Sequence, residues 1–92
     1  MSLFFVESPH TKEECAQALG DFASQNPDAL KNFVWGCGHG NHTAWGIVEG
    51  RNENAVRSLV PASVRNKASV TEVDRMNAQQ VKELLKMHAM HA

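Results

Sequence analysis

The sequence has no long apolar run, no block of like charges, and little proline or cysteine. Because no stretch of about 18 apolar residues occurs, we expect no segment to span a membrane. The net charge is −1, with nine Lys plus Arg against ten Asp plus Glu, and this balance disfavours a protein that binds the phosphate backbone of nucleic acids. A hydrophobic content of 42%, with three prolines and six glycines, is typical of a folded globular protein.

The N-terminal segment and the two cysteines indicate a cellular compartment. Residues 1–6 carry no basic side chain before a short apolar run that Glu7 ends, so they lack the parts of a signal peptide. We therefore expect a cytoplasmic protein. In that reducing compartment Cys15 and Cys37 are expected to be free thiols. The 92 residues are enough for a single domain, residues 1–92, with one modest core.

The first half of the chain predicts a strand, a helix and a hairpin. Residues 3–6 are apolar on both alternating faces, which indicates a strand covered on both sides. Thr11 and Glu14 have the spacing of a capping box and predict a helix that begins at Thr11. Two β-rich runs, residues 33–35 and 43–48, flank a glycine-rich segment and predict a hairpin.

The second half predicts a helix, a strand and a final helix. Asn52 is a suitable N-cap for a short helix. Residues 67–73 supply a weaker strand. Asn77 and Gln80 form a second capping box, which starts a C-terminal helix over about residues 77–89.

This order of elements predicts an α+β fold of the ferredoxin-like βαββαβ type. Right-handed crossovers give a four-stranded antiparallel sheet in the order 4-1-3-2, with two helices on one face and an extra C-terminal helix. The other face carries Phe and Trp side chains, which a second copy of the sheet would cover in a closed two-fold arrangement. We therefore expect a homodimer joined through its sheet faces.

The layout also resembles a known superfamily. The order of elements, together with the hairpin residues 35–37 (WGC) and 42–49 (HTAWGIVE), resembles the dimeric α/β-barrel superfamily, which includes GYD-domain, muconolactone-isomerase-like and antibiotic-biosynthesis-monooxygenase-like proteins. The resemblance spans nearly the whole chain and implies a dimeric α/β barrel. It includes no catalytic motif, so it transfers no active-site residue to this chain.

The hairpin loop contains the first candidate site. Cys37, His39 and His42 place one thiol and two imidazoles within six residues, and the glycines between them let the backbone curl around an ion. These donors suit zinc or copper. Their spacing matches no established zinc pattern, and the alternative is a glycine-rich turn whose imidazoles face water.

A second candidate pair flanks the start of the first helix. His10 and Cys15 form a possible Cys–His nucleophile, because the positive end of a helix lowers the pKa of a nearby thiol. The alternative is an inert thiol, since Cys15 also belongs to the apolar stripe of the helix. We expect this helix to start at the opposite end of the sheet from the hairpin loop, so that the pair and residues 37–42 stay apart within one protomer.

Aromatic and acidic residues supply the remaining candidates. Trp35 and Trp45 are expected either to form a cross-strand pair or, with His10, to line a pocket for a flat ligand, and core packing is the alternative. Glu7 and Glu49 end two central strands that we expect to be parallel, so their carboxylates would meet at one end of the sheet and transfer protons. The alternative is a pair of solvated strand ends.

The sequence therefore predicts a small cytoplasmic homodimer that binds a small molecule or a metal ion. One alternative is a cofactor-independent isomerase or monooxygenase in which His10 or a strand-end carboxylate moves a proton. Another is a structural dimer without a ligand, with a tightly filled interface.

Overall fold

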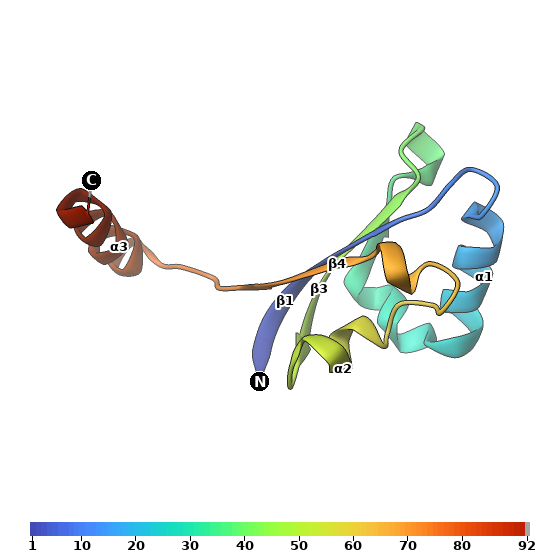
Figure 1. The fold of residues 1–92 in the computed structure, drawn as a ribbon, viewed down its shortest axis with the longest axis horizontal. Helices are drawn as coiled ribbons and strands as arrows, with labels where there is room; N and C mark the ends of the chain where they lie inside the picture. Colours follow the sequence, from blue (N-terminus) through green and yellow to red (C-terminus); the bar gives the residue numbers. More distant parts are fainter. Residues whose placement is uncertain (92) are drawn as a thin grey trace.

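The computed structural model describes the backbone of residues 1–91 and the side chains of residues 1–28 and 30–87. It shows an α+β protein with one four-stranded antiparallel sheet (Figure 1). The strands are β1 (Ser2–Pro9), β2 (Phe33–Trp35), β3 (Thr43–Gly50) and β4 (Ser69–Val73). The helices are α1 (Cys15–Gln25), α2 (Glu53–Arg57) and α3 (Ala78–His91), with short 3₁₀ turns η1 (Pro27–Asn32), η2 (Cys37–His39) and η3 (Arg65–Lys67). None of the helices among the described residues has both the length and the hydropathy needed to cross a bilayer.

The strands lie in the order β2-β3-β1-β4, which reads 4-1-3-2 from the β4 edge. All three neighbouring pairs are antiparallel. The β1–β3 ladder runs from Ser2 opposite Gly50 to Pro9 opposite Thr43. Because β1 and β2 both run antiparallel to β3, they run parallel to each other. The chain therefore leaves both strands at the same end of the sheet.

The start of α1 differs from the sequence prediction. The capping box is present, because the backbone N–H of Thr11 donates to Glu14 Oε1 at 2.8 Å and that of Glu14 donates to Thr11 Oγ1 at 3.2 Å. These bonds close a separate turn ahead of the helix, and α1 begins at Cys15 rather than at Thr11. Cys15 is therefore the first residue of the helix.

The other two helix starts agree with the prediction. The Asn52 side chain accepts a hydrogen bond from the backbone N–H of Ala55 at 2.8 Å. Asn77 and Gln80 each donate a backbone N–H to the other's side-chain oxygen at 2.9 Å. Each of these bonds satisfies an amide that has no partner within the helix.

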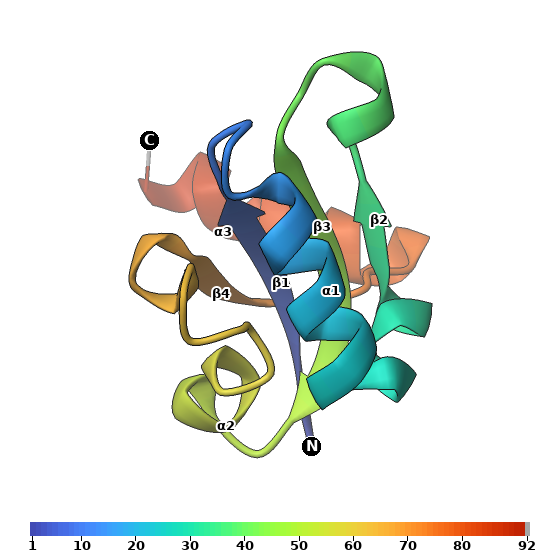
Figure 2. The ribbon, with the colours of Figure 1, turned by 90° about the vertical axis from the view of Figure 1, so that its right-hand side faces the viewer.

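The core lies between the sheet and the two helices that cover one of its faces, as Figure 2 shows. Phe22 of α1 is fully buried, and its ring centroid lies 5.0 Å from that of Phe33 and 5.2 Å from that of Trp35. Strand residues at every second position face the same layer. The buried apolar residues are Phe4, Val6, Ala18, Phe22, Phe33, Ala44, Val48, Val56, Val60, Val64 and Ala68.

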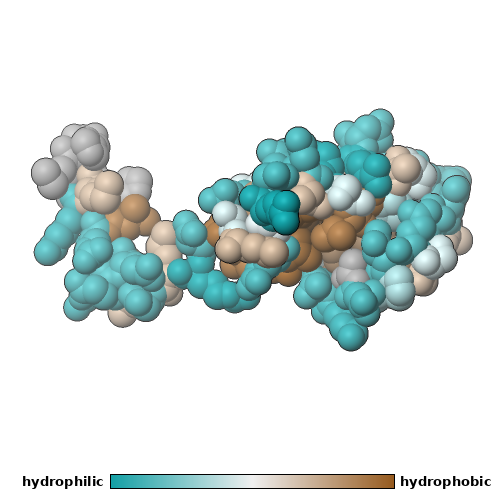
Figure 3. Space-filling view, turned by 90° about the horizontal axis from the view of Figure 1, so that it is seen from below, coloured by the Kyte–Doolittle hydropathy of each residue, from teal (hydrophilic) through white to brown (hydrophobic). Residues whose placement is uncertain are grey.

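The opposite face of the sheet, here called the open face, has no covering layer among the described residues. Its apolar side chains are Leu3, Phe5, Val34, Trp45, Ile47 and Val73. Helix α3 lies on this side of the sheet but apart from it, at the end of residues 74–77 (Figure 1). Seen from below, apolar surface is visible on the body and on the side of α3 that faces it (Figure 3).

Candidate metal centre

The β1–β3 register brings two histidines together at one end of the sheet. Pro9 and Thr43 form the last pair of the ladder, and the next residues in line are His10 and His42. The backbone N–H of His10 donates to the carbonyl oxygen of His42 at 3.0 Å, which adds one more pair. The centroids of the two imidazole rings lie 5.8 Å apart, with an interplanar angle of 68°.

The β2–β3 register adds a cysteine to the same end. Trp35 lies opposite Ala44, Cys37 follows Trp35 by two residues, and His42 precedes Ala44 by two. Because residues two apart on a strand point to the same face, His42 projects, like the buried Ala44, toward the face that α1 covers. Cys37 lies beyond the strand, and its Sγ atom reaches the same face, 3.2 Å from Nε2 of the buried His10. Turn η2 begins at Cys37, directly beyond the paired part of the hairpin.

Two glycines fix the shape of the hairpin loop. Gly40 has a φ of 86°, a left-handed conformation that favours glycine, and its N–H donates to the carbonyl oxygen of Cys37 at 3.3 Å. A Cβ atom on Gly36 would lie 2.6 Å from the carbonyl oxygen of Asn41 and 2.9 Å from the Trp45 ring. Close packing at one glycine and the turn at the other therefore set the direction of Cys37.

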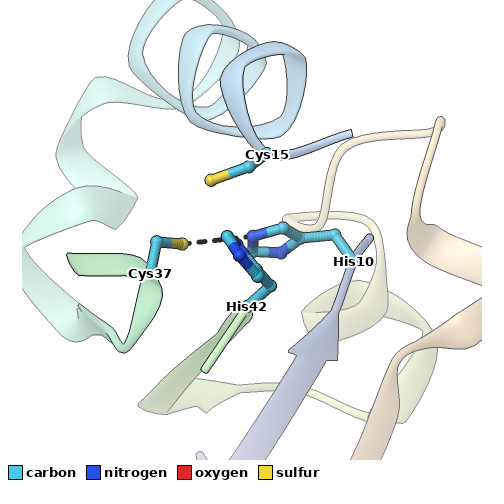
Figure 4. Close-up of side chains that lie close together, drawn as sticks. All are labelled: His10, Cys15, Cys37 and His42. Carbon is cyan, nitrogen blue, oxygen red and sulfur yellow. Dashed lines mark hydrogen bonds between the residues drawn. The ribbon is translucent and has the colours of Figure 1, made fainter. Parts of the chain in front are cut away.

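Cys15 completes the group from the helix above the sheet. As the first residue of α1, it lies seven positions before Phe22 and so belongs to the helix face that packs on the sheet. The ligand atoms of His10, Cys15, Cys37 and His42 all lie within 4.8 Å of one another. Figure 4 shows the four side chains pointing toward a common centre. We call these four residues the Cys₂His₂ cluster.

This cluster contradicts the expectation that the first helix starts at the opposite end of the sheet from the hairpin loop. The expectation was wrong because β1 and β2 run parallel, so the turn after β2 and the chain segment after β1 lie at the same end. His39, proposed from the sequence as a ligand beside Cys37 and His42, is exposed and lies outside the cluster. His10 and Cys15 complete the donor set instead.

The histidines lie in a partly apolar setting. His10 is 6% exposed, and its ring centroid lies 5.9 Å from that of Trp35. Its Nε2 atom is 3.2 Å from Sγ of Cys37. The Nδ1 atoms of His10 and His42 are both buried and have no hydrogen-bond partner among the described residues. A buried polar atom without a partner costs about 1–3 kcal/mol, and coordination of a cation through Nδ1 would remove that cost.

The Cys37 thiol is suited to coordination rather than to nucleophilic attack. Burial raises the pKa of the Cys37 thiol, and a hydrogen bond with Cys15 raises it further. A raised pKa leaves little thiolate at neutral pH, which argues against Cys37 as a nucleophile. A bound metal ion reverses this preference, because thiols coordinate in their deprotonated form.

The two tryptophans do not form the expected cross-strand pair. Trp45 lies opposite Val34, whereas Trp35 lies opposite Ala44, so the two rings point to opposite faces of the sheet. Trp35 packs beside His10 on the helix side. Trp45 lies on the open face and donates its Nε1–H to Oε1 of Glu7 at 3.2 Å. The pair therefore does not line one shared pocket.

The carboxylates of Glu7 and Glu49 do not meet either. The expectation that their strands run parallel was wrong, since β1 and β3 are antiparallel. Glu7 lies opposite Trp45, and Glu49 lies opposite Leu3, four positions away along β1, or about 13 Å. Both glutamates are exposed. They are solvated side chains near opposite ends of the ladder and do not share a proton.

One signal in the sequence points to all four members of the cluster. His10 and Cys15 have four residues between them, and so do Cys37 and His42. Combined with the two strand registers, this repeated spacing places the pairs at the same end of the sheet. Comparison with family models, curated proteins and solved structures finds no match to this chain.

Proposed function

We propose that this protein binds one transition-metal ion through the Cys₂His₂ cluster, and that Zn²⁺ is the ion that fits best. The supporting observation is that four ligand atoms lie within 4.8 Å of one another. In a tetrahedral zinc site, bonds of about 2.3 Å to sulfur and 2.0–2.1 Å to nitrogen place the ligand atoms about 3.3–3.8 Å apart. Movements of about 1 Å would close the cluster around an ion.

The donor types favour zinc over other ions. Thiolate and imidazole ligands in a tetrahedral arrangement are typical of Zn²⁺, whereas Mg²⁺ and Ca²⁺ prefer oxygen ligands. Two thiolates also balance the charge of a divalent ion, so the filled site is neutral and suits its partly buried position. A monovalent copper ion in the same site would leave a net negative charge there. Copper is therefore the competing ion against which zinc is tested.

The number of protein ligands indicates a binding site rather than a catalytic one. Four side-chain ligands fill a tetrahedral zinc ion and leave no position for water or substrate. Because the ligands come from the end of β1, the start of α1 and the hairpin loop, one ion would tie these three segments together. Its binding free energy would then add to the folding stability of the chain.

The proposal is tested by native mass spectrometry of the full chain with Zn²⁺, using Cu(I) as competitor. We expect one zinc ion per chain. The Cys15→Ser, Cys37→Ser and His42→Ala variants should each lose more than about 100-fold in zinc affinity, since even residues that only support a ligand are worth 10–100-fold. His39→Ala is the matched control, because it removes an exposed imidazole from the same loop.

Cobalt substitution gives a readout that does not depend on stability. Tetrahedral Co²⁺ bound to thiolates has characteristic visible and charge-transfer absorption, which Cys15→Ser and Cys37→Ser should each weaken. Circular dichroism of the metal-free variants checks that they remain folded. A wild-type chain that binds no zinc, or a His39→Ala variant that loses as much affinity as Cys37→Ser, would overturn the proposal.

A further inference from the structure

The open face presents apolar surface that the body of the protein leaves uncovered. Val34 is 66% exposed and Ile47 is 44% exposed. A shallow hollow of about 300 Å³ is lined by these two side chains together with Phe5 and Trp45. Contiguous exposed apolar surface of this kind marks an interaction site in soluble proteins.

Helix α3 has an apolar side that is also without a partner in the described structure. Val81, Leu84 and Leu85 recur at the spacing of one helix face, and they are 42%, 37% and 63% exposed. The helix has 14 residues, and isolated helices of about 12–15 residues are marginal in water. Packing of this apolar side against another surface would supply the missing stability.

The path of the chain keeps α3 away from its own sheet. Residues 74–77 continue from β4 without regular structure and carry the helix away from the body (Figure 1). They contain no glycine or proline, and their turn-forming residues are Asp74 and Asn77. The side chain of Asn77 caps α3, because its Oδ1 atom accepts a hydrogen bond from the backbone N–H of Gln80. The result is a space between the open face and the apolar side of α3.

We propose that a second copy of this chain occupies this space, and that each copy packs its α3 on the open face of the other in a two-fold dimer. In such a dimer both copies use the same surfaces. Each copy supplies a helix to the other copy and an open face that receives the other copy's helix. Their charges are complementary, because Lys82 and Lys86 lie on α3 while Glu7 and Glu49 lie on the open-face side of β1 and β3.

Exchanged helices and contact between the open faces together supply enough surface for a specific dimer. Four strands about 4.8 Å apart and about 20 Å long present roughly 400 Å² of sheet surface. A 14-residue helix about 21 Å long and about 10 Å wide adds roughly 200 Å². Each α3 covers about 200 Å² of the other copy's open face, so the two helix-on-sheet contacts bury about 800 Å². Contact between the remaining halves of the two open faces brings the total to about 1,200 Å², the lower limit for stable protein interfaces. The sheet faces alone would fall short of it.

The first test is the mass of the full chain by analytical ultracentrifugation, with zinc present. We expect a dimer. Ile47→Asp places a charge on the open face, and the double variant Leu84→Asp, Leu85→Asp places charges on α3. Each should weaken the dimer by at least about 30-fold, the effect typical of a central interface residue. Glu83→Gln is the control, because Glu83 lies outside the apolar side of α3.

Mixing the two variants tests whether the helices are exchanged. In a mixed dimer, the intact α3 of the Ile47→Asp chain meets the intact open face of the other variant. The mixture should therefore dimerise more tightly than either variant alone. A monomeric wild type, variants that stay dimeric, or a mixture no tighter than its components would each overturn the proposal. Zinc content, measured on the same samples, should not change with any of these substitutions.

Discussion

His10 and His42 form the pair one step beyond the last β1–β3 pair, joined by a backbone hydrogen bond of 3.0 Å. Residues opposite each other in an antiparallel ladder point to the same face, and a slip of one residue would send one imidazole to the open face. The register that buries Phe4 opposite Val48 therefore also assembles half of the Cys₂His₂ cluster.

Zinc should raise the thermal stability of the protein. At a free zinc concentration 100 times the dissociation constant, binding to the folded state alone contributes about 2.7 kcal/mol. For a domain of this size the melting temperature should rise by about 10–20 °C, as measured by differential scanning calorimetry. Excess chelator should reverse the rise, and Cys37→Ser should abolish it. An equal rise in that variant would place the stabilising ion elsewhere.

Gly40→Ala should destabilise the hairpin loop, whereas Gly38→Ala should not. The left-handed φ of 86° at Gly40 costs an alanine about 1–2 kcal/mol. At Gly38 an added Cβ meets no atom within 4 Å, so this variant is the matched control. Urea unfolding measures the stability, and zinc titration should show weaker binding for Gly40→Ala because the turn positions Cys37. Equal effects of the two variants would argue against this role of Gly40.

Stability below pH 4.5 should depend on Glu14. A hydrogen bond from Lys67, together with one from the backbone N–H of Thr11, lowers the pKa of Glu14 from 4.5 to about 2. A carboxyl whose pKa is lower in the folded state stabilises the protein fully above its unfolded pKa, and this contribution is lost as the pH falls toward about 2. Lys67→Met should flatten the pH dependence of the unfolding free energy between pH 4.5 and 2.

The measurement is urea unfolding of the metal-free protein at a series of pH values. Lys31→Met is the control, because Lys31 forms only an exposed ion pair with Asp28 at 4.0 Å and should leave the slope unchanged. A Lys67→Met variant with the wild-type slope would show that this ion pair does not govern the titration of Glu14.

Phe22→Ala should cost about 3–5 kcal/mol of stability, the range for a fully buried aromatic residue. Its ring packs on Phe33 and Trp35, and Trp35 lies beside His10. Leu19→Ala, on the same helix but 37% exposed, should cost much less. Chemical denaturation compares the two variants, and near-equal losses would mean that α1 packs on the sheet differently from the arrangement described.

Much of the fold could be predicted from local sequence signals. The capping residues of α2 and α3 are confirmed by hydrogen bonds, because a cap depends on side chains only three residues apart. The hairpin strands were predicted within a few residues for a similar reason. The start of α1 was missed because Thr11 and Glu14 close their own turn, and a capping box alone does not distinguish that turn from the first turn of a helix.

The candidate site depended on relationships that local patterns do not contain. Cys37 and His42 were identified from their chemistry, but their association with His10 and Cys15 follows from the direction of β2 relative to β1. Register likewise decides that Trp35 and Trp45 lie on opposite faces of the sheet. The antiparallel direction of β1 and β3 places Glu7 and Glu49 near opposite ends of the ladder. The resemblance to dimeric α/β barrels stays a prediction.

The matched spacing within the two ligand pairs has a consequence for how the chain folds. Contacts between β1 and β3 join residues far apart in sequence and form slowly, because long loops must close first. Cys37 and His42 are separated by only four residues, so an unfolded chain can hold an ion through this pair at small entropic cost. Refolding with zinc would then start from a preformed hairpin loop, onto which the segment carrying His10 and Cys15 docks.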